Sequence, residues 1–277
     1  MSIASNAGES LSERVERLLE RVEYRRAETS QDIETALRLR YDAYLREGAI
    51  IPNAEKKLFD NFDGLKNSHT FSVYIDGVLA SSFRIHLLTP EHRTSPAMEA
   101  FPDFFEPALD AGHTFIDGNR FVANYDVARF FPELPFLTIR VPYMAAAYFN
   151  TDYISATVRA EHQAFYRRWF GLRVACPPRP YPTLTKPISL MLLDYKNGGK
   201  ENILRKHPYF RSSPAERQRL FAPDTYGSAS MVRRPASGER GRHPVHRVPS
   251  RSGLHLPLDE PCRRQARSMI GTTPLKC

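Results

Sequence analysis

Charged side chains occur in four segments of this chain that otherwise have the pattern of half-buried structure. They are Arg40 in a helix pattern, Asp60 and Asp63 in the loop FDNFDG, Arg84 in the strand pattern SSFRIHL, and Asp117 with Arg120 in the strand pattern TFIDGNRFV. Buried charges must be paired or neutralised, and arginine and carboxylate groups pair in geometrically specific forks. We therefore expect Arg40 and Arg84 to pair with the two loop aspartates, inside a cleft that the loop phenylalanines wall.

Two other interpretations of these charges are possible. The first is a purely structural ion network that fixes the loop to a sheet, since paired charges often serve only the fold. The second is a calcium loop, but FDNFDG lacks the glutamate that an EF-hand loop places six residues after its glycine. The convergence of charge from four segments favours a functional site over the structural network.

The segments that carry these charges follow a mixed order of helix and strand patterns. Residues 10–22 and 30–48 have apolar positions at helical spacing, and the phenylalanine-rich loop follows. Two alternating runs around Asp76-Gly77 predict a β-hairpin with a type I′ turn. Further helix and strand patterns alternate up to residue 195. The order predicts a mixed α/β protein around a central, partly antiparallel sheet.

The positive charge of the chain is concentrated at its C-terminal end. Residues 1–199 hold 23 basic and 25 acidic side chains, whereas residues 200–277 hold the remaining 16 basic and 6 acidic ones. We expect an amphipathic helix within 1–23, one folded domain over 24–204 and a basic, largely disordered tail over 205–277. The tail has no folded nucleic-acid-binding motif, so no nucleic-acid partner is expected.

The N-terminal residues lack the apolar stretch of a signal peptide. No apolar run approaches the roughly 20 residues that span a bilayer. We therefore expect a cytoplasmic protein without a transmembrane segment.

Four segments in this order resemble one enzyme family: LRLRYDAYLREG, EKKLFDNFDG, SSFRIHLL and FIDGNRFVA. They are similar to the long-chain N-acyl amino acid synthases and to the related acyl-homoserine lactone (autoinducer) synthases, over roughly residues 24–195. The resemblance implies a GNAT-like three-layer fold, with a mixed, mostly antiparallel twisted sheet flanked by helices. It also implies an acyltransferase that takes its acyl group from the phosphopantetheine of acyl carrier protein and has no permanently bound cofactor.

The resemblance also assigns roles to individual residues of this chain. It implies a catalytic part for Asp117, as the base, and for Arg120. It implies substrate binding by Arg40, Tyr44, Asp60, Asp63, Arg84 and Phe121. Three differences from the related proteins stand out: Asp117 replaces a glutamate, Ile50 replaces a tryptophan of the lactone synthases, and the glycine-rich Q/RxxGxG/A loop of coenzyme A-dependent acetyltransferases is missing.

The loss of the tryptophan favours the N-acyl amino acid branch, and a carrier-bound donor has no pyrophosphate for a glycine-rich loop to bind. An acyl carrier protein is acidic, so its docking surface should be basic. Arg167, Arg168, Arg173 and Arg179 are the candidates for that surface, although a solvated helix face would look the same. The candidates for the acyl-chain wall are Phe101, Phe104, Phe105 and the helix 135–149.

The preferred function is transfer of a long-chain acyl group from a carrier-protein thioester to the α-amine of an amino acid. In this reaction Asp117 accepts a proton from the amine, and a backbone N–H after Arg120 stabilises the oxyanion. One alternative is an autoinducer synthase that uses S-adenosylmethionine. The other is a catalytically inactive module of the same fold that binds carrier protein or lipid.

Overall fold

The structure is a computed structural model that describes residues 8–181, 186–223 and 231–233. Its helices are α1 (Leu11–Leu19), α2 (Ser30–Arg46), α3 (Pro96–Ala100), α4 (Pro102–Asp110), α5 (Tyr125–Ala128), α6 (Leu134–Phe149), α7 (Gln163–Phe170), α8 (Lys200–Lys206) and α9 (Pro214–Phe221), with the short helical turns η1 (Ala160–His162), η2 (Tyr195–Gly199) and η3 (Pro208–Phe210). Its strands are β1 (Val22–Arg26), β2 (Ser68–Ile75), β3 (Val78–Leu88), β4 (Phe115–Ala123), β5 (Tyr153–Val158), β6 (Arg173–Arg179), β7 (Ile188–Asp194) and β8 (Met231–Arg233).

The described strands form one sheet in the order β6-β7-β5-β4-β3-β2-β1-β8. Every neighbouring pair is antiparallel except β4 and β5, which are parallel. The predicted mixed, mostly antiparallel sheet is therefore confirmed. The hairpin between β2 and β3 is confirmed as well, because Asp76 and Gly77 both have the positive φ that a type I′ turn requires.

Both faces of the sheet are buried, and successive residues of a strand alternate between them. Phe115 and Tyr153 contribute to a core on one face, and their neighbours Ile116 and Ile154 contribute to the core on the other face. Strand β7 consequently has a nearly continuous apolar sequence, ISLMLLD, which is typical of a strand covered on both sides.

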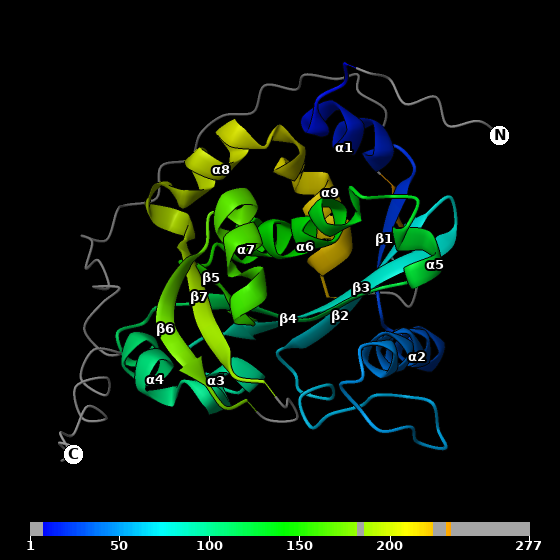
Figure 1. Cartoon of the computed structure of the whole chain (residues 1–277). Coiled ribbons are helices and arrows are strands. Elements are labelled where there is room, and N and C mark those ends of the chain that lie inside the picture. Colours follow the sequence, from blue (N-terminus) through cyan, green and yellow to red (C-terminus); the bar gives the residue numbers. More distant parts are fainter. Residues whose placement is uncertain (1–7, 182–185, 224–230, 234–277) are drawn as a thin grey trace, which may run out of the picture.

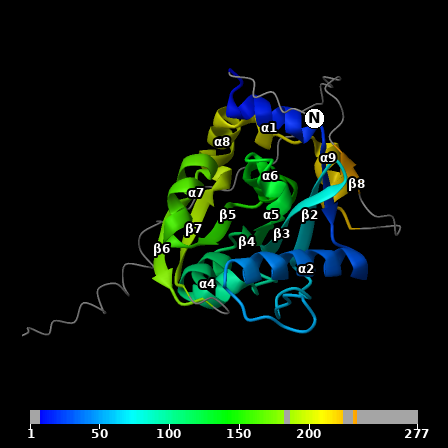
Figure 2. The same ribbon diagram turned by 45° about the vertical axis from the view of Figure 1, so that its right-hand side comes forward.

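Helices cover the two faces as separate layers (Figure 1). Helix α6 crosses one face, with α1, α8 and α9 packed around it, while α2, α3 and α4 lie on the opposite face. In the rotated view, α2 runs along the sheet above the loop that follows it in the sequence (Figure 2). The capping box of α2 is formed by Thr29 and Asp32.

The structure differs from the sequence prediction at the start of the tail. Residues 208–221, which were expected to be disordered, form η3 and α9 against α6, and Tyr209, Phe210 and Leu220 are buried. The reason is a buried ion pair in which the Arg140 guanidinium of α6 donates to both carboxylate oxygens of Glu216, at 2.5 and 2.9 Å. The rest of the predicted tail lies outside the described residues, apart from β8.

The N-terminal helix is not a separate unit, because Val15, Leu18 and Leu19 of α1 are buried in the same core as α6. Among the helices that the structure describes, none is long and apolar enough to cross a membrane.

Candidate active site

A cavity of about 1070 Å³ opens where the two parallel strands of the sheet separate. The pairing of β4 with β5 ends at Gly118 and Ala156, and beyond that point the backbone groups of β4 that face β5 have no strand partner among the described residues. The apolar side of the cavity is formed by β3, β4, α6, β5 and α7, through Phe83, Val122, Ile139, Pro142, Tyr143, Ile154, Val158, Phe165 and Leu172. This shape gives an elongated ligand access to unpaired strand backbone.

Helix α6 lines this cavity, in agreement with the expected acyl-chain wall. The other predicted wall residues do not line it. Phe101, Phe104 and Phe105 are buried in the core on the opposite face of the sheet, between α3, α4 and the strands.

Gly118 marks the point where the strands separate, and it tolerates no side chain in the present packing. A Cβ atom at this position would lie 2.7 Å from Cζ of Phe83, which also lines the cavity. The Phe83 ring is itself held by an edge-on contact with Phe121, with ring centroids 6.1 Å apart.

The variant Gly118→Ala is expected to push the Phe83 ring into the cavity. Overpacking of this kind costs about 1–3 kcal/mol, so the free energy of unfolding should fall by that amount in denaturant titrations. Turnover of long-chain acyl donors should fall more than turnover of short-chain donors. The double variant Gly118→Ala/Phe83→Leu should recover both quantities, and an unchanged chain-length profile in Gly118→Ala would contradict this role for the ring.

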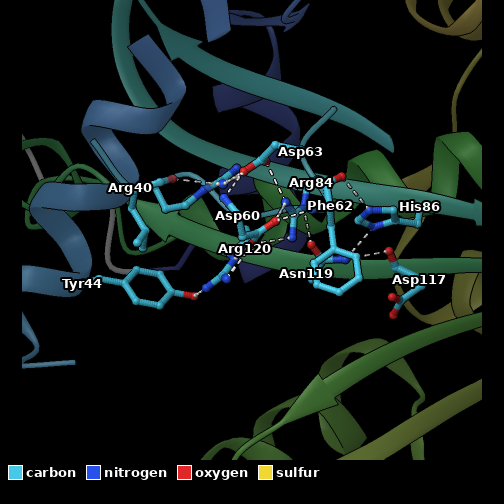
Figure 3. Close-up of polar contacts among 11 residues, drawn as sticks. Arg40, Tyr44, Asp60, Phe62, Asp63, Arg84, His86, Asp117, Asn119 and Arg120 are labelled. Atoms are coloured by element: carbon cyan, nitrogen blue, oxygen red, sulfur yellow. Dashed lines mark hydrogen bonds and ion pairs between the residues drawn. The ribbon is translucent and has the colours of Figure 1, made fainter. Parts of the chain in front are cut away.

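A buried ion cluster lies beside the cavity and joins α2, the loop after it and the sheet (Figure 3). The Arg40 guanidinium donates to both Asp63 oxygens at 2.9 and 2.8 Å, and it is only 1% exposed. Arg84, which is 0% exposed, donates to Asp60 at 2.6 and 3.0 Å and to Asp63 at 2.7 Å. The expected pairing of the two arginines with the two loop aspartates is present in the structure.

Arg120 connects this cluster to the cavity. Phe83 of β3 lies opposite both Arg120 and Phe121, so β4 has a β-bulge there, and Arg120 has a left-handed backbone with φ of 51°. Its guanidinium donates to Asp60 at 2.9 and 2.6 Å and to the Tyr44 hydroxyl at 3.1 Å. Arg120 and Tyr44 both line the cavity.

The cluster of Arg40, Arg84 and Arg120 with Asp60 and Asp63 holds one more positive than negative charge. Burial alone would raise the pKa of Asp60. Hydrogen bonds from Arg84 and Arg120, together with their charges, outweigh burial and hold that pKa far below its usual range. Asp60 therefore acts as a fixed anion that holds Arg120, one of the residues that line the cavity.

Two further side chains, which the sequence prediction did not single out, extend the cluster. Asn119 accepts from Arg84 at 2.6 Å and donates to Nδ1 of His86 at 3.0 Å, so Nε2 of His86 donates to the carbonyl oxygen of Phe62. Burial lowers the pKa of His86 to about 3, which keeps the ring neutral. His86 lies two residues after Arg84, and Asn119 lies two after Asp117, so the two-residue period of a strand could have identified both.

Asp117 is fully buried on the same face of the sheet as this cluster. Its Oδ1 accepts from the Ser155 hydroxyl at 3.3 Å, and its Oδ2 has no hydrogen-bond partner among the described residues. Burial raises the pKa of Asp117 to about 6, although the neighbouring hydroxyls of Ser95 and Ser155 and the charge of Arg84 act in the opposite direction. A carboxylate with this pKa accepts and releases protons near neutral pH.

The structure separates the predicted site residues into two groups. Tyr44, Arg120 and Phe121 line the cavity, whereas Arg40, Asp60, Asp63, Arg84 and Asp117 lie behind its wall. The expectation that the loop phenylalanines wall a cleft around the aspartates is wrong. Phe59 is 60% exposed, and Phe62 packs edge-on against His86, because the mutual pairing of the charges leaves no open space between them.

The four arginines predicted to dock a carrier protein differ in their surroundings. Arg167 and Arg168 on α7 and Arg173 on β6 are exposed. Arg179 instead donates to both carboxylate oxygens of Asp103 on α4 and lies over the Phe101 ring. Its contribution is therefore to the packing of α4 against β6, and the exposed candidates are the other three.

One protein family matches the part of the chain that contains these residues. The family described as "FeeM: N-acyl amino acid synthase FeeM" matches residues 35–194, which is more than half of the chain and includes the ion cluster, Asp117 and Ser155. The chain belongs to the FeeM family of N-acyl amino acid synthases. The family resemblance expected from the sequence is thereby confirmed, and this family member is an acyltransferase.

The chain is also similar to several solved structures. The chain is similar to FeeM, an N-acyl amino acid synthase from uncultured soil microbes, with 17% sequence identity and a TM-score of 0.54 over 67% of this chain and 96% of that chain. It is also similar to an acyl-CoA N-acyltransferase from Pseudomonas aeruginosa (17% identity, TM-score 0.43, 62% of this chain and 98% of that one). A third is BjaI, a coenzyme A-dependent acyl-homoserine lactone synthase (16% identity, TM-score 0.45, 65% and 83%). The likeness to FeeM confirms the expected GNAT-like fold. No curated protein sequence matches the chain.

Proposed function

We propose that this protein transfers a long-chain acyl group from a thioester of acyl carrier protein to the α-amine of an amino acid. The products are an N-acyl amino acid and the free thiol of the carrier. No permanently bound cofactor takes part in this reaction. Since carrier-protein thioesters are met in the cytoplasm, we also propose a cytoplasmic enzyme.

The observation that carries this proposal is the position of the cavity at the end of the β4–β5 pairing. A pantetheine arm is an amide chain, and it can satisfy its hydrogen bonds on the unpaired strand backbone there. A thioester carbonyl placed at the same point would lie against backbone groups of β4 beyond Gly118. A backbone N–H at this position can stabilise the oxyanion of the tetrahedral intermediate.

The polar end of the cavity suits the acceptor. Arg120 and Tyr44 are the groups that we propose contact the acceptor's carboxylate, since both line the cavity and the Arg120 guanidinium suits a carboxylate. Arg40, Arg84, Asp60 and Asp63 act from behind by fixing the position of Arg120. Phe121 closes the apolar side, and Asp117 is the base that takes up the proton of the amine.

We propose that the exposed arginines of α7 and β6 dock the carrier protein. Substituting Arg167 and Arg168 together by glutamate should then raise KM for acyl carrier protein by roughly tenfold or more, because a charge reversal opposes the approach of an acidic partner. The matched control is a small thioester donor, acyl-pantetheine, for which KM should stay unchanged. Equal effects on the two donors would contradict a docking role.

Thiol release tests the choice of substrates. The purified protein is given acyl carrier protein or acyl-coenzyme A as donor, with either a mixture of amino acids or S-adenosylmethionine as acceptor. The proposal predicts thiol release that requires amino acids and is faster with the carrier-protein donor. Release that requires S-adenosylmethionine would instead indicate a lactone synthase, and release with neither acceptor would point away from aminolysis.

A further inference from the structure

Ser155 lines the cavity and also forms a hydrogen bond to Asp117. The two residues are direct neighbours in the parallel register of β4 and β5, and the Ser155 hydroxyl donates to Asp117 Oδ1 at 3.3 Å. Both residues are 0% exposed. Ser155 lines the cavity and Asp117 does not. Ser155 therefore connects the wall of the cavity to the buried carboxylate.

Other titratable groups of the cavity are poorly placed to serve as the base. Exposed side chains on the wall of the cavity are open to water, and these are Asp42, Glu47, Asp126 and His162. His86 is buried near Asp117, but both of its ring nitrogens are occupied, by Asn119 and by the carbonyl oxygen of Phe62. Asp117 is thus the buried base, and it needs an intermediary to reach an amine in the cavity.

We infer that Ser155 is a catalytic residue that contacts the acceptor amine and relays its proton to Asp117. This inference rests on the proposed function and adds a second group to its chemistry. Before the nitrogen attacks the thioester carbon, one proton of the substrate's ammonium group moves to Ser155 Oγ and the hydroxyl proton of Ser155 moves to Asp117 Oδ1. When the tetrahedral intermediate collapses, the C–S bond breaks and the leaving sulfur takes up a proton from the nitrogen, so an amide, a thiol and protonated Asp117 result, and Asp117 then releases its proton to solvent.

The groups that face Asp117 support proton transfer from Ser155 to Asp117. Arg84 from β3 favours the ionised carboxylate, and the neutral ring of His86 lies opposite Asp117 in the β3–β4 register. Tyr181, which follows β6, is buried and stays protonated, because burial and the neighbouring Asp117 raise its pKa. With no second carboxylate among these groups, the proton that arrives through Ser155 has one acceptor, Asp117.

Two variants and a control test the relay in the same product assay. Ser155→Ala should lower kcat by roughly 10²- to 10⁴-fold, the range of general acid–base catalysis, with KM for the acceptor changed less than threefold. Ser155→Thr keeps a hydroxyl and should stay within about tenfold of the original protein. The control Ser189→Ala removes another buried strand serine, one whose hydroxyl accepts from Gln163, and should leave kcat unchanged.

The pH profile and a second acceptor separate proton transfer from simple packing. In the original protein kcat should fall as the pH drops below about 6, and Ser155→Ala should lose this limb. With hydroxylamine, which is largely unprotonated at neutral pH, the original protein and Ser155→Ala should turn over at similar rates. A Ser155→Ala protein with unchanged kcat, or one equally impaired with hydroxylamine, would overturn the relay. Absence of N-acyl product from the original protein would instead overturn the proposed function, and the relay with it.

Discussion

Replacing Asp117 by asparagine is expected to lower kcat by roughly 10²- to 10⁴-fold and at the same time to stabilise the fold at pH 7. The activity falls because an amide cannot take up the amine proton. The fold gains stability because the buried carboxylate has to be ionised at pH 7 and the amide does not. A loss of function coupled to a gain in stability is the signature of a catalytic group held in an unfavourable environment.

The sign of the stability change follows from the pKa. The folded protein raises the pKa of Asp117 from its ordinary 3.8 to about 6. Between these values the native state binds more protons than the unfolded state, so stability falls with rising pH and stays reduced above pH 6. At 1.36 kcal/mol for each pKa unit, the full effect is about 3 kcal/mol.

Denaturant unfolding at two pH values measures this effect. Asp117→Asn should be more stable than the original protein at pH 7, and the difference should disappear below about pH 4, where both states of the original protein hold the proton. Asp110→Asn, at an exposed aspartate of α4, is the control and should show neither change. A loss of stability in Asp117→Asn at pH 7 would mean that the carboxylate is a structural group.

Replacing Arg84 by alanine should produce a large loss of stability. Arg84 is 0% exposed and donates to Asp60, Asp63 and Asn119. Without Arg84, Asp60 is left with Arg120 alone and Asp63 with Arg40 alone, and breaking buried ion pairs in this way typically costs 3–5 kcal/mol. Activity should fall as well, since Asp60, which holds Arg120 at the cavity, would lose its own bonds to β3 of the sheet.

Lowering the pH distinguishes the loss of ion pairs in Arg84→Ala from the loss of packing that the smaller side chain also causes. The pKa of Asp60 is depressed, so the stability it contributes is present above its unfolded pKa of about 4 and is lost as the pH falls toward the folded value. The difference between Arg84→Ala and the original protein should therefore shrink at low pH. Arg21→Ala breaks the exposed pair with Asp76 and should cost less than about 1 kcal/mol at any pH. A pH-independent difference for Arg84→Ala would contradict the ionic origin.

The ion pairs of this site could be predicted from sequence because a charged side chain within an apolar pattern must be paired or neutralised. Arg40 and Arg84 both lie among buried positions, and the loop offered two aspartates at a suitable spacing. The position of these ion pairs relative to the substrate could not be predicted. It depends on the β-bulge that gives Arg120 a positive φ and brings its guanidinium to Asp60, and no periodicity reveals such a bulge.

The cavity could not be located from sequence for a related reason. It depends on where β4 and β5 stop pairing, at Gly118 and Ala156, which is a property of two strands far apart in the chain.

The start of the tail was misplaced because basic composition suggested disorder. The compensating signal was Arg140, a charge within the otherwise apolar helix α6, whose partner Glu216 lies in the segment expected to be disordered.

Mass spectrometry of the reaction product is the measurement that tests the proposed acyl transfer most directly. The purified protein is incubated with acyl carrier protein that bears a long acyl chain and with a pool of ¹⁵N-labelled amino acids. We predict a labelled N-acyl amino acid that is formed by the original protein and is absent with Asp117→Asn, although that variant is folded. Product formed equally by both proteins would contradict the role of Asp117, and no labelled amide from the original protein would contradict the proposed reaction.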